Sequence, residues 1–212
     1  MKTLFGYRHG DRDASKIALT FDDGPSLCTK DVLAILREHK VTATFFLIGN
    51  HIEQLPDGAR EILAEGHEIG THTYSHQELS WAQRLFWPFP DEEVLKTHRV
   101  VEEILGIKTK LFRPLKSLAL HWGYRGFLAR HSLVPVLASA YSRAGRPAQR
   151  QLKDIKRRLR GGDIILLHDS HDISIRSDKW SRKTIEILPD FIEYTRRKDL
   201  RFVSVSELLK LN

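Results

Sequence analysis

The sequence predicts an α/β fold in which about seven parallel strands alternate with helices and form a closed or nearly closed barrel. The first observation is that short apolar runs alternate with helical patterns about seven times along the chain. The second is that residues able to bind metal or move protons directly follow these runs, as expected of barrels whose chemistry gathers at the carboxyl ends of the strands. An open, doubly wound sheet is the alternative.

Each element is predicted from its own stretch of sequence. Buried-type residues predict strands at 16–21, 42–48, 67–70, 110–113, 133–137, 163–168 and 202–205. Apolar residues at helical spacing predict helices at 29–39, 57–65, 91–105, 122–130, 147–160 and 182–197, the last kinked at Pro189. Ser206, placed before Glu207, predicts the N-cap of a final short helix, because a serine hydroxyl accepts hydrogen bonds from free backbone N–H groups.

Residues 80–90, SWAQRLFWPFP, fit none of these patterns. The two tryptophans, two phenylalanines and two prolines cannot all be core residues at helical spacing. The segment is interpreted as a loop folded back over the domain. Its functional interpretations are a wall on which substrate stacks or a contact with a membrane interface.

Length and composition predict one globular catalytic domain over residues 1–212. The net charge is +7 and the sequence pI about 9.6, with basic clusters at 143–150, 153–160 and 196–201. These clusters predict solvated helix faces or a surface for an anionic membrane or an acidic polysaccharide. No nucleic-acid partner is expected, because no zinc-finger, recognition-helix or interleaved basic and aromatic pattern is present.

The expected location is the cytoplasm or the periphery of a membrane. No stretch approaches the roughly 20 apolar residues that span a bilayer. The first residues, MKTLFGYRHGDRDASK, lack the apolar region of a signal peptide, so secretion is expected only if a leader has been removed. Cys28 is the only cysteine, which excludes an internal disulfide.

Four predicted strands carry chemically active side chains at or directly after their ends. Asp22 and Asp23 follow the first strand in TFDDGP, and His72 and His76 follow the third in GTHTYSH. Arg113 ends the fourth in LFRP, and His168 and Asp169 end the sixth in IILLHDS. Because the carboxyl ends of the strands meet at one rim, these groups are expected to lie together.

The rim residues predict a site for one divalent metal ion. His72 and His76 are four residues apart, so a helical turn places both rings on one face. Two imidazoles and one carboxylate suit a divalent ion with open positions for water and substrate. Adjacent aspartates point in different directions along a strand, so one of Asp22 and Asp23 binds the cation while the other takes a proton. The stretch HEIGTH is not a zinc-protease helix, because its histidines are five residues apart.

The motifs TFDDGP, HTYSH, FRP and LLHD, in this order, resemble the polysaccharide deacetylase family, also known as the NodB-homology domain, a carbohydrate esterase family. The resemblance covers about residues 15–209. It implies a distorted, incomplete (β/α) barrel, a divalent metal, zinc before cobalt, nickel or manganese, and an acetylated sugar or glycan as the substrate. The implied reaction is hydrolysis of N- or O-linked acetyl groups.

The resemblance also implies a role for each matching residue. Asp22 is the expected general base and His168 the general acid, and Arg113 pairs with Asp22. The implied metal ligands are Asp23, His72 and His76. The backbone N–H of Lys116 is expected to stabilise the oxyanion, and Leu167 to line the pocket for the acetyl methyl group.

Two motifs depart from the family pattern. In the third, RPLKS, Leu115 stands in place of the second proline and Ser117 in place of glycine, so this loop is expected to move more freely. The fourth motif lacks its aspartate and tryptophan; the candidates to replace them beside His168 are Ser139, Tyr141 and Ser142. The stretch HDSHD at 168–172 is interpreted as the acid histidine plus a polar loop rather than as a second metal site.

Three functions therefore stay open. The first is a metal-dependent deacetylase of an amino sugar or acetylated glycan. The second is a de-N-acylase or deformylase of a lipid-linked or small glycoside, favoured by the aromatic segment and the basic surface. The third is a glycan-binding pseudoenzyme, favoured by the two altered motifs.

Overall fold

The computed structural model describes residues 2–142, 146–170 and 179–211. Its strands are β1 (Lys2–Thr3), β2 (Gly6–Tyr7), β3 (Lys16–Asp22), β4 (Thr44–Leu47), β5 (Glu68–Thr71), β6 (Leu111–Phe112), β7 (Val134–Pro135), β8 (Ile164–His168) and β9 (Arg201–Val203). Its helices are α1 (Thr29–Glu38), α2 (Gly49–Gln54), α3 (Pro56–Ala64), α4 (Trp81–Phe86), α5 (Asp91–Leu105), α6 (Lys116–Ala119), α7 (Tyr124–His131), α8 (Ala148–Arg158), α9 (Lys179–Arg196) and α10 (Val205–Leu209).

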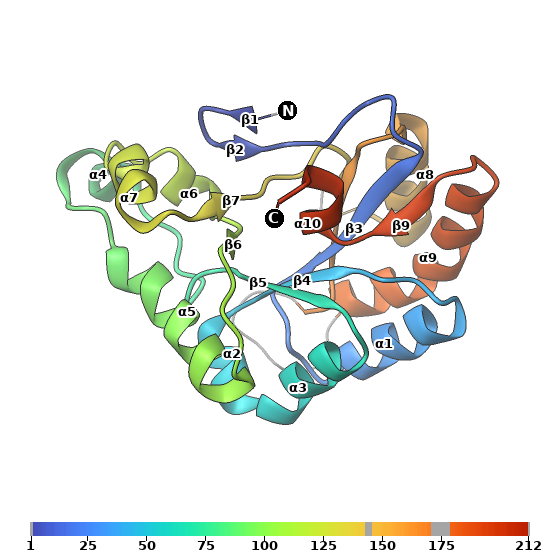
Figure 1. Cartoon of the computed structure of the whole chain (residues 1–212), viewed down its shortest axis with the longest axis horizontal. Coiled ribbons are helices and arrows are strands. Elements are labelled where there is room, and N and C mark those ends of the chain that lie inside the picture. Colours follow the sequence, from blue (N-terminus) through green and yellow to red (C-terminus); the bar gives the residue numbers. More distant parts are fainter. Residues whose placement is uncertain (1, 143–145, 171–178, 212) are drawn as a thin grey trace.

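The strands from β3 to β9 form one curled, wholly parallel sheet, as the sequence predicts (Figure 1). The order is β7-β6-β5-β4-β3-β8. Strand β9 pairs with the first half of β3 on the side where β4 pairs with the second half. Among the described residues, no strand ladder joins β7 to β8. The segment after β7 meets β8 through isolated bridges, such as Ala140 with Ile165, and through bonds of Ser139 to Asp163 and Ile164. The barrel is therefore incomplete, and its gap lies between β7 and β8.

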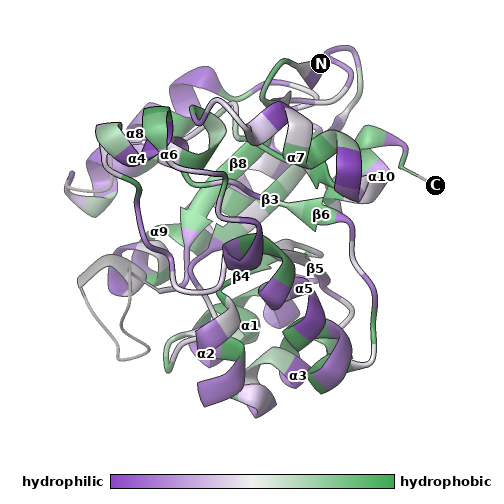
Figure 2. Cartoon of the chain, turned by 90° about the vertical axis from the view of Figure 1, so that its left-hand side faces the viewer, coloured by the Kyte–Doolittle hydropathy of each residue, from purple (hydrophilic) through white to green (hydrophobic). Residues whose placement is uncertain are grey.

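Alternation along the strands builds two cores. Leu19, Phe45 and Ile165 point outward and pack against α1, α8, α9 and their neighbours in the larger core. Residues one position away, Ala18, Phe46 and Ile164, point inward and form a smaller core with Val205 and Leu208 of α10. Figure 2 shows β3 and β8 as apolar strands between helices with polar outer surfaces. Helix α10 thus fills one part of the barrel interior.

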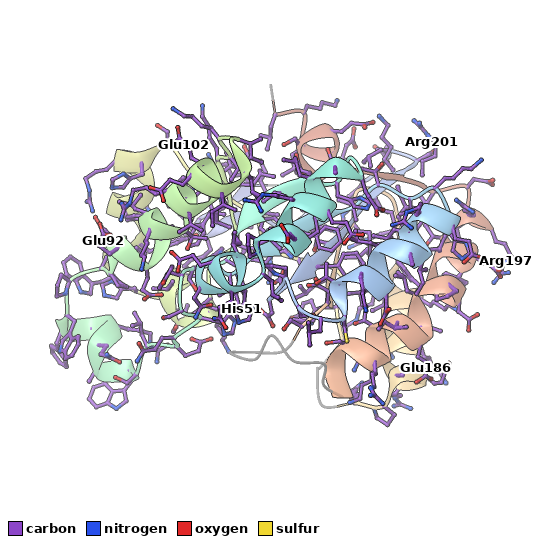
Figure 3. All side chains as sticks on the ribbon, turned by 90° about the horizontal axis from the view of Figure 1, so that it is seen from below. His51, Glu92, Glu102, Glu186, Arg197 and Arg201 are labelled. Carbon is purple, nitrogen blue, oxygen red and sulfur yellow. The ribbon has the colours of Figure 1, made fainter. Side chains whose placement is uncertain are left out.

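The helices follow the predicted amphipathic patterns. Helix α5 begins with Asp91, Glu92 and Glu93, which complement the helix dipole, and ends at Gly106 in the left-handed conformation. Helix α9 runs through Pro189. The labelled Glu102 and Glu186 project from the outer surfaces of α5 and α9 (Figure 3). Within the described residues, no helix combines the length and the apolar composition needed to cross a bilayer.

Three local predictions need correction. The N-cap of the final helix is Ser204 rather than Ser206. The helix begins at Val205, which is buried, and Ser204 Oγ accepts from the Glu207 N–H. The segment 80–90 is not wholly loop, since it contains α4. No pattern in the sequence predicts the β1–β2 hairpin, α2 or α6, because these elements are too short to show a period.

Candidate active site and metal centre

Alternation along two neighbouring strands brings Asp22 and His168 to one rim. They are the last residues of β3 and β8 and are paired in register. Ala18 and Ile164 face the barrel interior, so Asp22 and His168, each an even number of residues further on, face the same side. The candidate base and the candidate acid therefore stand side by side above the inner core.

Asp23, His72 and His76 converge on one point. The Asp23 Oδ1 atom lies 3.5 Å from His72 Nε2 and 3.3 Å from His76 Nε2. Among the residues that the structure describes, these three form the group of metal-ligand atoms that lie within 4.8 Å of one another. Ligands about 2.1 Å from a tetrahedral cation are about 3.4 Å apart, which matches both distances. The donor set and its spacing therefore fit a divalent cation of the zinc type.

The backbone around these ligands is strained. Asp23, Thr73 and His76 have φ of 75°, 64° and 57°, in the left-handed region that disfavours side chains. Residues 72–79 are not helical, so the predicted helical turn between the two histidines is wrong. The turn at Thr73 brings the rings to a centroid distance of 5.1 Å instead. Such strain, costing on the order of 1–3 kcal/mol per residue, is typical of functional sites.

Arg113 joins the candidate base to the rest of the barrel. Its Nη1 donates to Asp22 Oδ1 at 2.5 Å and to Thr20 Oγ1 at 2.7 Å, and its Nε donates to the Val136 carbonyl at 3.1 Å. The guanidinium carbon also lies 4.0 Å from the centre of the Phe46 ring. Burial lowers the pKa of Arg113, while the Asp22 carboxylate opposes this change. These contacts fix the orientation of the Asp22 carboxylate.

The His72 ring is oriented by a backbone acceptor. Its Nδ1–H donates to the Arg113 carbonyl at 2.7 Å, which leaves the lone pair of Nε2 directed toward Asp23. Burial lowers the pKa of His72 to about 4, although the nearby Asp22 carboxylate raises it. The imidazole is therefore neutral near pH 7, as a metal ligand must be.

Two further buried residues support the site: His51, which the sequence reasoning did not select, and Asp169, which it placed at the rim without a specific role. His51, in α2, donates from Nδ1 to the Asp23 carbonyl at 2.8 Å. Asp169 accepts from Thr29 Oγ1 at 2.5 Å, and its carbonyl accepts from Ser26 Oγ at 2.6 Å. Burial raises the pKa of Asp169 to about 7. Their positions in the sequence could have indicated a role, because both residues follow the ends of strands that adjoin β3.

A pocket of about 400 Å³ opens over Asp22, His72 and Arg113. Apart from these three residues, its lining consists mainly of apolar side chains with two cations at Arg8 and Lys116; the apolar lining residues are Phe5, Pro114, Leu115, Ala119, Leu120, Leu137, Ala138, Tyr141 and Leu166. The predicted role of Leu167 is wrong, because Leu167 packs in the outer core. Side chains alternate along β8, so Leu166 lines the pocket instead.

Two candidates for the missing fourth motif are engaged elsewhere. Ser139 donates to Asp163 at 2.7 Å and Ser142 to Asp154 at 2.9 Å. Tyr141 lines the pocket, so it is the remaining candidate to replace the fourth-motif residues beside His168. Part of the HDSHD stretch and part of the basic cluster at 143–150 lie outside the described residues.

Comparison with known proteins gives consistent matches. The model of the family described as polysaccharide deacetylase matches residues 9–118. A peptidoglycan-N-acetylglucosamine deacetylase of Bacillus cereus is 39% identical over 109 residues, which are 50% of this chain and 38% of that protein. A chitooligosaccharide deacetylase of Bradyrhizobium is 35% identical over 179 residues, or 79% of this chain and 78% of that protein. The chain thus spans less than two fifths of the first relative and almost four fifths of the second.

Solved structures share the fold. The crystal structure of a peptidoglycan N-acetylglucosamine deacetylase, in complex with 4-naphthalen-1-yl-N-oxidanyl-benzamide, superposes with a TM-score of 0.79. The sequences are 26% identical, and the superposition covers 97% of this chain and 92% of that one. The incomplete barrel is therefore the fold of that deacetylase.

Proposed function

This chain belongs to the polysaccharide deacetylase family, and we propose that it is a metal-dependent hydrolase that removes N- or O-linked acetyl groups from an amino sugar or acetylated glycan. The observation that carries the proposal is the convergence of Asp23, His72 and His76 beside the Asp22–Arg113 pair. The relatives' names point to glycans of N-acetylglucosamine as the first substrates to test. The catalytic domain is proposed to extend over residues 1–212.

The metal-binding residues are Asp23, His72 and His76. A divalent cation held there, zinc before cobalt, nickel or manganese, would lower the pKa of a bound water toward about 7 and would polarise the acetyl carbonyl. The Nδ1–H of His72 and the carbonyl of Asp23 are both hydrogen-bonded to neighbouring elements. These bonds hold two of the three ligands in place before any ion binds.

Asp22 is the proposed general base. Its carboxylate lies next to the ligand set, 3.9 Å from His72 Nε2, and takes the proton of the attacking water. Arg113 holds Oδ1 of this carboxylate, which leaves Oδ2 on the side of His72 as the proton acceptor. Because Arg113 is itself bonded to Thr20 and Val136, it acts as a positioning residue for the base.

His168 is the proposed general acid, paired with Asp22 across β3 and β8. It protonates the leaving amine, or the leaving alkoxide of an ester, so that water and the acetylated sugar yield acetate and the free sugar group. The backbone N–H of Lys116, at the pocket, is proposed to donate to the developing oxyanion. Leu166 forms the wall against which the acetyl methyl group packs.

The test is acetate release from N-acetylglucosamine oligomers by purified protein, with metal analysis of the same sample. We expect Asp22→Asn to lower kcat by about 10²–10⁴-fold. The matched control is Asp57→Asn, which changes a carboxylate exposed on α3 and paired with Arg60. Full activity of Asp22→Asn, or activity unchanged after complete metal removal, contradicts the proposal.

A second candidate is a de-N-acylase or deformylase of a lipid-linked or small glycoside. The apolar lining of the pocket favours it, because a long glycan needs more hydroxyl-binding side chains than this pocket offers. Faster release of acid from a short amphiphilic glycoside than from an oligomer supports this candidate. Stoichiometric metal binding and glycan binding, with no acid released from either substrate, identifies a pseudoenzyme instead.

A further inference from the structure

Most of the exposed large apolar side chains lie in one part of the molecule. Of the ten such residues in the described chain, six fall in segments 79–90 and 114–130, which we call the aromatic lobe. These six are 49–74% exposed and are Trp81, Leu85, Phe86, Trp87, Leu120 and Trp122. The lobe carries α4, α6 and α7 and lies at the left of Figure 1, away from α8 and α9. Exposed large apolar side chains that gather in one part of a surface are typical of an interaction site.

Helix α4 has its apolar side chains on the outside. Trp81, Leu85 and Phe86 are exposed, whereas Ala82, Gln83 and Arg84 are partly buried. A helix packed on a soluble protein normally has the opposite arrangement. The Gln83 side chain accepts from the Ser80 N–H at 2.8 Å and completes a capping box with it. The capping box therefore fixes where α4 begins, and the burial pattern of the helix leaves its large apolar side chains facing outward.

The two segments of the lobe are also held to each other. The Trp87 carbonyl accepts from Trp122 Nε1 at 3.2 Å and from the His121 ring at 3.1 Å. These bonds place the Trp122 indole and the His121 ring against the backbone of Trp87. The two segments are therefore held together rather than exposed as separate loops.

The charge of the lobe is of one sign. Its 29 residues include four cations and no aspartate or glutamate; the cations are Arg84, Lys116, Arg125 and Arg130. At the average of the chain, 27 acidic residues in 212, a stretch of this length carries about four. Two carboxylates contact the lobe at its margin, because Asp91 pairs with Arg130 and Glu78 accepts from the Ser117 N–H. The cations of the lobe still outnumber them, and an apolar face with an excess of cations fits an anionic apolar surface. It does not fit a second copy of the chain, because the cations of two such faces repel each other.

We propose that the aromatic lobe docks on anionic phospholipid bilayers. Trp and Leu side chains enter the headgroup boundary, and Lys and Arg bind the anionic headgroups. A neutral glycan gives no reason for an excess of cations, and Leu85 adds nothing to sugar stacking. Lys116 and Leu120 belong to both the lobe and the pocket lining, so docking brings the pocket mouth to the lipid surface. This proposal is independent of the proposed hydrolase activity.

The test is sedimentation of the purified chain with vesicles of phosphatidylglycerol and phosphatidylcholine, and with vesicles of phosphatidylcholine alone. We expect binding to the first at about 0.1 M salt and its loss at about 0.5 M, because salt screens the headgroup charge. Trp81, Trp87 and Trp122 are three of the four tryptophans, so docking also shifts the intrinsic emission to the blue. Phe86→Ser, at a side chain that is 74% exposed, lowers the partition coefficient about tenfold with an unchanged melting temperature.

A matched pair of variants separates the lobe from general basicity. Arg125→Gln lowers binding to anionic vesicles about fivefold, whereas Arg157→Gln, which removes the same charge from exposed α8, leaves it unchanged. Equal effects of the two variants, or no effect of Phe86→Ser, overturn the proposal. The proposal is also overturned if the chain binds insoluble chitin or peptidoglycan but no vesicles, and if Phe86→Ser abolishes that binding. Dimerisation that Phe86→Ser abolishes, without vesicle binding, overturns it as well.

Discussion

His98 is expected to make the folded state sensitive to acid. The side chain lies on α5, where its Nδ1–H donates to the Thr109 carbonyl at 3.1 Å and its Nε2 lies 3.0 Å from Thr71 Oγ1. Since Nδ1 carries the proton, Nε2 accepts from the Thr71 hydroxyl. This bond ties α5 to the residue before His72. Burial lowers the pKa of His98 from 6.5 to about 4.

The magnitude follows from this difference in pKa. Between pH 6.5 and 4 the unfolded chain binds a proton at His98 and the folded chain does not, so stability is complete above pH 6.5 and is lost as the pH falls. A difference of this size corresponds to about 3 kcal/mol in the free energy of unfolding, of which about 2 kcal/mol is lost between pH 7 and pH 5.

The perturbation is His98→Gln, which keeps one donor and one acceptor but cannot be protonated. The assay is urea unfolding of wild type and variant at pH 7 and pH 5, both in chelator so that metal binding does not contribute. We expect the loss of stability between the two pH values to be smaller in the variant by about 2 kcal/mol. Equal losses in the two proteins would refute the reasoning, because His98 would then titrate alike in the folded and unfolded states.

Three further predictions concern the loop after β3, helix α3 and the metal. In Gly24→Ala the new Cβ lies 2.4 Å from Oδ2 of the fully buried Asp169, so we expect a loss of about 1–3 kcal/mol in thermal unfolding, and an unchanged melting temperature contradicts this. In Gly58→Ala the Cβ meets Pro25 at an ordinary 3.4 Å, so we expect a gain of about 0.5–1 kcal/mol, and a loss contradicts it. Metal at 100 times its Kd is expected to raise the free energy of unfolding of wild type by about 2.7 kcal/mol relative to chelated protein, and to leave that of His76→Gln unchanged. Equal shifts of the melting temperature of the two proteins in calorimetry would exclude the assigned ligands.

The fold could be predicted because its signal is local. Most of the parallel strands are short apolar runs with polar flanks, and all seven appear within a few residues of the predicted positions. The bounds are less predictable, because they depend on the partner strand. Strands β6 and β7 are shorter than predicted, because only Leu111 and Phe112 pair with Val134 and Pro135. No pattern within 133–137 itself carries that information.

The site could be predicted only in part, because its residues come together through the topology. The position after a strand end was enough to select Asp22, His72, Arg113 and His168. The bonds of Arg113 to Thr20 and Val136 depend on register across strands and left no trace in the spacing. The choice between Leu166 and Leu167 was available from the sequence, since alternation places only Leu166 on the same face as His168.

The departures from the family pattern and the aromatic lobe are physically linked at Ser117. Its Oγ accepts from the Leu79 N–H at 3.0 Å, and its own N–H donates to the Glu78 carboxylate at 3.2 Å. A glycine at this position has no oxygen to accept the first of these bonds. Leu115, which replaces a proline, is buried with Phe112 and Tyr124 in the core of the lobe. The chain that leaves His76, a proposed ligand, is thus anchored on α6 where it enters the lobe, so the altered motif supports the face that we expect to meet the membrane.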